Sequence, residues 1–403
     1  MTRRSIGIAL VAGVWLAATV QTAEAAPCLL VTLTGTQSGP SVFNGQAGAG
    51  TLVRYGDDAN ACGAIKLQFD TGRGTNMRLS QIDVAPQQLN AIFLTHIHGD
   101  HTEGLADVLM LRWYMKGSKL DIVCSSDAVS VFGFTNSCRN FVRHVADAFL
   151  QSGEIAERRS EDGGRVEGGP AQVTNVITFD PKDEPQVVWS SGDVKVLAIR
   201  STHIAGHASY RVDTPAGSVV IGGDASNDVT APPRAHSTSD QVEKLAQGAD
   251  VIVHSTMHPI LAPDKGSGFP APIFYRQSMT TDLGAMAKRV GAKYLMLTHL
   301  APSLGTARHN RWDVPGGPLT EADYRKAVAA SPELQLWELN SPRYGFPRSK
   351  HTLAISDRLA LQCPGRIFMR MLSRRCLLLG ALVAPWAAHA QNWPAGNIKI
   401  VVP

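Results

Sequence analysis

The segment Thr95–His101 (THIHGDH) constrains this chain more than any other stretch. It places His96, His98, Asp100 and His101 within six positions, directly after an apolar run. Side chains two positions apart point to the same side of an extended segment, so the first two histidines can bind one ion, while the pair after the turn can reach a second. Nitrogen and carboxylate ligands without thiolates favour zinc, with manganese or iron as weaker alternatives. The segment therefore predicts a metal site, against the alternative of a chance cluster of surface histidines.

The composition is that of an ordinary globular protein. Of the 403 residues, 44% are hydrophobic and 18% are charged, which provides enough apolar material for one large domain or two or three small ones. The formal net charge of +4 is small, and no basic run stands out in the middle of the chain. We therefore expect no extended nucleic-acid-binding surface.

Residues 1–25 have the pattern of a secretory signal peptide. Arg3 and Arg4 precede an apolar run over Ile6–Val20, and Ala23–Ala25 offers a small-x-small cleavage site. The run is short for a membrane-spanning helix, which is the alternative interpretation. We expect cleavage after Ala25, a periplasmic or secreted location, and no stable membrane association of the mature domain.

The cysteines can then be interpreted for an oxidising compartment. Four of them lie in the expected mature domain, and none forms a CxxC pair, so metal ligation by thiolates is disfavoured. An even number favours disulfides, and the simplest pairing joins Cys28 to Cys62 and Cys124 to Cys138. Buried free thiols are the alternative.

Short apolar strands end repeatedly at a residue that can bind a metal. This happens before His96, Asp224, His254 and His299. Sites built from loops at strand ends are typical of α/β scaffolds. A structural role is the better interpretation of any single histidine, but the repetition favours one convergent site.

These residues make the chain resemble the metallo-β-lactamase superfamily, and within it the ribonuclease Z-like phosphodiesterase branch. The stretch FLTHIHGDHTEGL at 93–105 is similar to the metal motif of that branch, and FDTGRGT at 69–75 is similar to its first motif. Gly222-Gly223-Asp224 and Leu297-Thr298-His299 extend the resemblance. It implies an α/β fold, the αβ/βα four-layer sandwich, in a hydrolase domain over residues 26–330.

The resemblance also implies a centre of two zinc ions. One ion would bind His96, His98 and His203, the other would bind Asp100, His101 and His299, and Asp224 would bridge both. His203 is favoured because it lies seven positions before Tyr210, as in the family, and His207 is the alternative. Asp70 resembles a carboxylate that supports the ligand loop without binding metal.

The family mechanism implies attack by a hydroxide shared between the two ions. Asp100 would orient this nucleophile, and His254 would donate a proton to the leaving group, although Ser255 stands where the family has the Glu partner of that histidine. A satisfied strand-end histidine is the alternative for His254. We predict an exported dinuclear zinc-dependent hydrolase that acts on phosphodiesters or related esters, with a small-molecule or nucleotide-type substrate. A homodimer would be typical of the family.

Two features make tRNA an unlikely substrate. The interval between Tyr210 and Asp224 has no room for the long glycine- and proline-rich arm that many tRNA-processing members use, and export would separate the protein from tRNA. A ribonuclease Z-type tRNA 3′-processing endoribonuclease is nevertheless the main alternative. Lactonase, β-lactamase or arylsulfatase activity are further alternatives, as is an inactive zinc-binding protein, against which the complete ligand set argues.

The last part of the chain, 331–403, does not follow the pattern of the domain. A second signal-peptide-like segment lies at 371–390, with two arginines before an apolar run and Ala388–Ala390 as a cleavage site. We interpret this region as a frameshifted or read-through tail. A C-terminal membrane anchor is the alternative.

Overall fold

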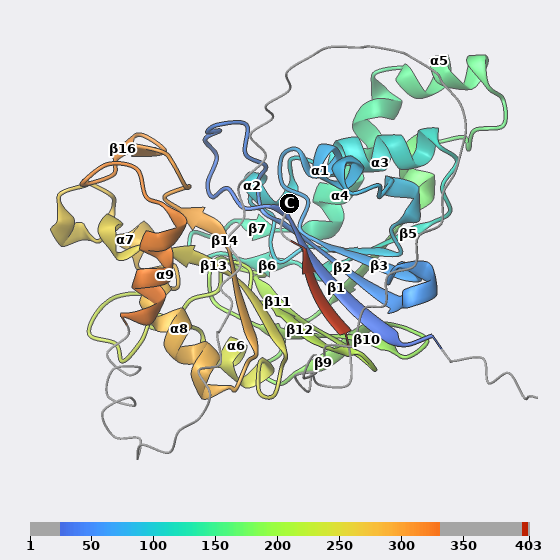
Figure 1. Ribbon diagram of the computed structural model, residues 1–403. Coiled ribbons are helices and arrows are strands. Elements are labelled where there is room, and N and C mark those ends of the chain that lie inside the picture. Colours follow the sequence, from blue (N-terminus) through green and yellow to red (C-terminus); the bar gives the residue numbers. More distant parts are fainter. Residues whose placement is uncertain (1–24, 331–396, 402–403) are drawn as a thin grey trace, which may run out of the picture.

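The structure is a computed structural model that describes residues 25–330 and 397–401 (Figure 1). Apart from Ala25, the predicted signal peptide lies outside these residues, as do 331–396 with the signal-peptide-like segment at 371–390. Both interpretations therefore stay predictions. None of the described helices is long and apolar enough to cross a bilayer.

The first sheet has seven strands in the order β17-β1-β2-β3-β4-β5-β8. The pairs β1–β2 and β2–β3 are antiparallel, while β3, β4, β5 and β8 run parallel to one another, and β17 pairs in parallel with β1 at the edge. Its strands are β1 (Pro27–Gly35), β2 (Gly50–Asp57), β3 (Ile65–Phe69), β4 (Ala91–Phe93), β5 (Leu120–Ser125), β8 (Thr174–Phe179) and β17 (Asn397–Val401).

The second sheet has six strands in the order β14-β13-β12-β11-β10-β9. The strands β12, β13 and β14 are parallel, and the others pair antiparallel. Its strands are β9 (Gln186–Ser191), β10 (Val194–Arg200), β11 (Ala208–Thr214), β12 (Gly217–Ile221), β13 (Val251–Met257) and β14 (Tyr294–Ala301). Two short hairpins are formed by β6 (Ala128–Val129) with β7 (Thr135–Asn136) and by β15 (Arg308–His309) with β16 (Trp312–Asp313).

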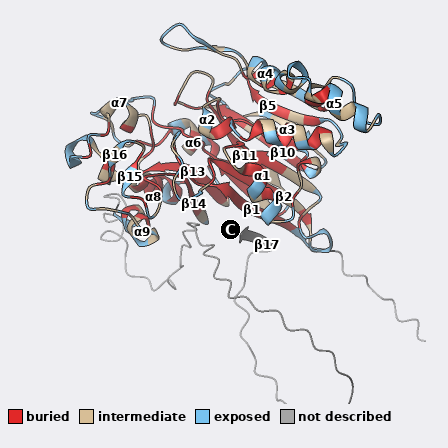
Figure 2. Ribbon diagram, turned by 90° about the horizontal axis from the view of Figure 1, so that it is seen from above, coloured by how far each residue is buried: buried red, intermediate tan, exposed pale blue. Residues whose placement is uncertain are grey.

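Helices cover the outer face of each sheet. Those on the first sheet are α1 (Thr75–Gln81), α3 (Leu105–Tyr114) and α4 (Cys138–Gln151), followed by α5 (Glu154–Glu161); those on the second are α6 (Asp240–Leu245), α8 (Thr280–Arg289) and α9 (Glu321–Ala329). The short helices are α2 (Gly99–Thr102), α7 (Ala271–Phe274) and the 3₁₀ turns Asp58–Asn60, Pro86–Gln88, Gly169–Val173, Pro259–Leu261 and Pro263–Lys265. Figure 2 shows the sheets as the most buried part, with exposed residues on the outer sides of the helices.

Strand alternation assigns each apolar side chain to one layer. On β4, Ala91 and Phe93 join the core between the two sheets, whereas Ile92 packs against the helices on the outside. On β13, Val253 faces the other sheet and Ile252 faces the helices. Three apolar layers thus separate four layers of secondary structure, and the predicted αβ/βα four-layer sandwich is confirmed.

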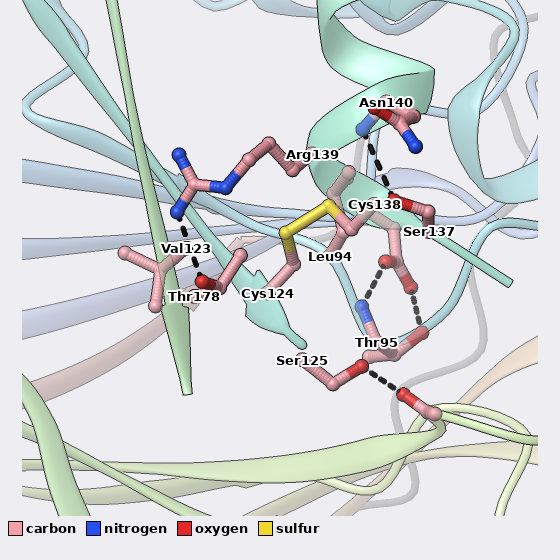
Figure 3. The surroundings of a disulfide bond; sticks show 12 residues. Leu94, Thr95, Val123, Cys124, Ser125, Ser137, Cys138, Arg139, Asn140 and Thr178 are labelled. Carbon is pink, nitrogen blue, oxygen red and sulfur yellow. Dashed lines mark hydrogen bonds between the residues drawn. A yellow bond between two sulfur atoms is a disulfide. The ribbon is translucent and has the colours of Figure 1, made fainter. Parts of the chain in front are cut away.

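Two disulfides have the predicted pairing, Cys28–Cys62 and Cys124–Cys138. The second joins the end of β5 to the start of α4, next to Leu94 and Thr95 of the metal motif (Figure 3). At the same end, the Ser137 side chain caps α4 by accepting a hydrogen bond from the backbone amide of Asn140.

Candidate metal centre and pocket

The chain turns within the metal motif, and this turn separates its ligands. His98 has an extended backbone and immediately precedes α2, which holds Asp100 and His101. His96 and His98 therefore leave an extended segment with Nε2 of the first 2.9 Å from Nδ1 of the second, while Asp100 and His101 leave a helical turn.

The predicted ligand residues come from segments that are far apart in the sequence and lie together in the structure. Ligand atoms within 4.8 Å of one another form three overlapping groups, which share members and so make one cluster. The groups are His96 with His98 and His203; His96 with His101 and Asp224; and Asp100 with His101 and His299. All seven residues of the predicted ligand set are thus brought together.

Asp224 lies in the centre of the cluster. Its Oδ2 is 3.7 Å from His203 Nε2 and 3.3 Å from His299 Nε2, and its Oδ1 is 3.5 Å from His101 Nε2. Within the described part of the chain, neither Asp224 Oδ1 nor His101 Nε2 has a hydrogen-bond partner, although both are buried. Two buried ligand atoms that face each other without a hydrogen bond fit a cation, and this ligand set suits zinc.

Burial and neighbouring charges together set the protonation of the histidines in the cluster. Burial lowers the pKa of His203 to about 4 and, together with neighbouring histidines, holds the pKa of His96 well below its ordinary value. Burial also opposes a charge on His101, but Asp224, Asp70 and Asp100 outweigh it and raise the pKa of that imidazole well above its ordinary value. Without a metal, His101 therefore carries a proton that offsets the carboxylates.

Asp70 holds the motif in place from below. Its carboxylate accepts hydrogen bonds from the amide and the hydroxyl of Thr95, each at 2.8 Å, and from His101 Nδ1 at 2.8 Å. These bonds direct His101 Nε2 toward Asp224 and fix its tautomer, as outer carboxylates do for metal-binding histidines. Asp70 thus lies where the predicted supporting role requires.

The structure brings His203, and not His207, into the ligand cluster. Both ring nitrogens of His207 are used: Nδ1 lies 2.8 Å from the Ser201 hydroxyl, and Nε2 accepts the backbone amide of Asp224 at 3.1 Å. His207 therefore positions Asp224. This approach needs Gly223, which has a φ of +60° and where an added Cβ would come within 2.9 Å of His207 Nε2.

His254 lies in the middle of β13, beside Gly222 and close to the ligand cluster. Its side chain is fully buried on β13 and is absent from the pocket lining. Its ring lies against Gly222, its Nδ1 lies 2.7 Å from the Ser255 carbonyl, and its buried Nε2 has no hydrogen-bond partner among the described residues. The catalytic role of His254 therefore stays a prediction.

One pocket of ≈ 590 Å³ opens over the cluster. Its floor is formed by metal-motif and strand-end residues, and Gly39 at its rim donates its amide to Asp100 at 2.9 Å. The opposite side, here called the pocket wall, consists of Phe269–Gln277 and His309–Trp312, which meet next to α7 and β16 (Figure 1). Sequence reasoning missed this wall, because none of the motifs named above lies in it.

Comparisons with known proteins find one matching family model and several similar sequences and structures. A family model described as "Anti-Pycsar protein Apyc1" matches residues 59–258, which include the metal motif, His203 and Asp224. Ribonuclease Z of Mycobacterium bovis (strain BCG / Pasteur 1173P2) is 26% identical over 288 residues, which cover 70% of this chain and 90% of that protein. Ribonuclease Z of Mycolicibacterium gilvum is 28% identical over 284 residues, covering 70% of this chain and 87% of that protein.

Among solved structures, the protein YhfI from Bacillus subtilis, with a metallo-β-lactamase fold, has a TM-score of 0.47 at 19% identity and covers 75% of this chain and 92% of its own. The short form of human tRNase Z has a TM-score of 0.46 at 20% identity and covers 67% of this chain and 92% of its own.

Proposed function

We propose, from the premise that this chain is a metal-dependent hydrolase of the metallo-β-lactamase superfamily in its ribonuclease Z-like branch, that it is an exported dinuclear zinc enzyme for phosphodiesters or related esters. One observation carries the proposal: seven ligand-type residues from separate segments converge in one cluster, and five of them line the floor of one pocket. A chain without metal chemistry would gain nothing from gathering two carboxylates and five imidazoles there, most of them buried. The carboxylates are those of Asp100 and Asp224.

The residues named above would hold two ions, with Asp224 between them. When bound, such a pair supplies a water of lowered pKa at neutral pH and stabilises negative charge that develops on the substrate. The protein's own residues prepare this site. Asp70 fixes His101, His207 fixes Asp224, and the Gly39 amide fixes Asp100, whose carboxylate is then directed to His299 Nε2 at 2.8 Å.

Export is part of the proposal. Its support is the signal-peptide pattern together with two disulfides, which persist in oxidising compartments. Expression in a Gram-negative host should yield a periplasmic protein that begins at Ala26. A cytoplasmic protein with an intact N-terminus would contradict it. The homodimer stays a prediction, which size-exclusion chromatography can test.

Cleavage of tRNA is the second candidate, because the curated relatives are named ribonuclease Z and so weigh against excluding RNA. Against it, β11 and β12 are joined by the two residues Pro215 and Ala216, so the interval between Tyr210 and Asp224 carries no arm. The lactone, β-lactam and aryl sulfate alternatives belong in the same substrate panel.

The test compares hydrolysis of bis-p-nitrophenyl phosphate with cleavage of precursor tRNA by the zinc-loaded protein, with and without a chelator. We expect diester hydrolysis that the chelator abolishes and zinc restores. Cleavage of precursor tRNA without diester hydrolysis would favour the second candidate, and hydrolysis that resists the chelator would reject a metal-dependent enzyme.

A further inference from the structure

The pocket wall carries two arginines without an acidic partner. Among the residues that the structure describes, neither Arg276 nor Arg311 forms an ion pair, and the Nε of Arg276 is buried with no hydrogen-bond partner. A buried N–H group without a partner is costly, so a guanidinium in this state is suited to an anion that arrives from the pocket.

Arg276 adjoins the metal floor. Its backbone carbonyl accepts a hydrogen bond from His203 Nδ1 at 3.3 Å. Burial lowers the pKa of His98 and of His203, and the positive charge of Arg276 contributes to lowering each of them. The guanidinium is thus close to the histidines of one predicted ion, on the side from which a substrate would approach.

An aromatic surface lies farther along the same wall. Trp312 lines the pocket and is half-buried, and its ring packs edge-on against buried Phe269 with 4.9 Å between centroids. The Arg311 guanidinium is 4.8 Å from the centroid of the Trp312 ring. A fixed indole ring beside cations provides a surface for a planar, electron-rich ring.

We infer that the pocket wall is a subsite for a small anionic ester that carries an aromatic ring, with Arg276 binding an oxygen of the anionic group and Trp312 supporting the ring. The inference rests on the proposed function and names its substrate class, aryl or nucleoside esters of phosphate. A pocket of ≈ 590 Å³ is in the range of roughly 300–1,000 Å³ that holds small molecules. Arginine suits the role because its planar fork matches phosphate oxygens.

The first experiment compares two substrates with the same leaving group, anionic bis-p-nitrophenyl phosphate and neutral diethyl p-nitrophenyl phosphate. Arg276→Ala should lower kcat/KM for the anionic diester about 10- to 100-fold and leave the neutral triester unchanged, because a charge-assisted hydrogen bond is lost. Arg276→Lys should keep part of the activity. The matched control is Arg308→Ala, an exposed arginine of the β15–β16 hairpin that pairs with Asp313 and lies outside the pocket lining.

The second experiment uses binding, which needs no turnover. Phenyl phosphate should bind the zinc-loaded protein more tightly than inorganic phosphate in calorimetry. Trp312→Ala should remove this difference of about 5-fold, as expected for one aromatic contact, and Arg276→Ala should weaken both ligands.

The outcomes distinguish the failure of the subsite from the failure of the proposed function. A wild-type protein that hydrolyses no ester but binds phenyl phosphate through Arg276 would reject the proposed function and keep the subsite. Active enzyme in which Arg276→Ala behaves like Arg308→Ala would overturn the subsite, as would loss of zinc or of triester hydrolysis in Arg276→Ala, because these results would indicate a structural role.

Discussion

The floor and the wall of the pocket are built in opposite ways. The floor takes its side chains from the ends of strands and from α2, buries them, and ties them to the sheets through Asp70 and His207. The wall takes its side chains from connecting segments, leaves Arg311 exposed and Trp312 half-buried, and pairs neither of its arginines with an acid. A rigid floor can hold catalytic groups in place. Substitutions in a wall made of loops can change which substrate binds without changing the fold.

The largest effect should come from the centre of the floor. Asp224→Asn keeps the shape of the side chain but removes the charge that would bridge two ions, so kcat/KM should fall at least about 10³-fold and zinc content should drop. Metal analysis measures the zinc content, and diester hydrolysis measures kcat/KM. Asp213→Asn, at an exposed carboxylate that pairs with Arg211, is the control and should change neither. Full activity of Asp224→Asn would show that the floor takes no part in catalysis.

The second-largest effect should be on the stability of the fold, through the disulfide that lies next to the floor. Replacing Cys124 and Cys138 together by alanine removes a cross-link that closes a loop of 14 residues, and the free energy of unfolding should fall by about 3 kcal/mol. Urea denaturation measures this change. The zinc content of the folded variant should stay the same, because neither cysteine binds the ions. Zinc loss in the folded protein would show that the disulfide also shapes the floor.

A smaller effect should follow from the support of the floor. Asp70→Asn removes the charge that holds His101 and keeps the side-chain size, so activity or zinc affinity should fall about 10- to 100-fold. Zinc titration with a competing chelator measures the affinity. If the loss equals that of Asp224→Asn, Asp70 would have to be a ligand rather than a support.

The smallest effect is a pH dependence that the floor should show and the wall should not. The raised pKa of His101 means that its ring is protonated in the metal-free protein at neutral pH, so zinc binding must release this proton. Apparent affinity should then rise with pH, by up to about tenfold per unit for one proton, until His101 is neutral. Calorimetry in buffers of different ionisation enthalpy counts the protons. A count of zero would contradict the protonated state of His101.

The parts of the fold and site that sequence predicted are those with a local signature. The metal motif specifies its own turn, since His96 and His98 lie on an extended segment and Asp100 and His101 on the helix that follows. The cysteine pairs and the strands that lead to Asp224 and His299 could also be predicted, because alternation and strand length are properties of neighbouring residues.

Three histidines show where sequence reasoning reaches its limit. His203 and His207 are four positions apart in one loop, and only the contacts of Asp224 and Ser201 decide which of them faces the ligand cluster. His254 follows an apolar run in the sequence as the predicted ligands do, but it lies in the middle of β13 with its ring against Gly222 and outside the pocket lining. The direction of a side chain depends on strand register, which the local pattern does not specify.

The sequence by itself determined the chemistry of this protein: the ligand types, the metal they favour and the layered α/β frame that holds them. Only the tertiary structure decided the wall. Arg276 and Phe269 belong to connecting segments and Trp312 to a two-residue strand, so none has a periodic pattern, and Phe269 and Trp312 meet through packing between distant parts of the chain. Short-range chemistry can be encoded in a motif, whereas the space above it depends on how separate segments pack.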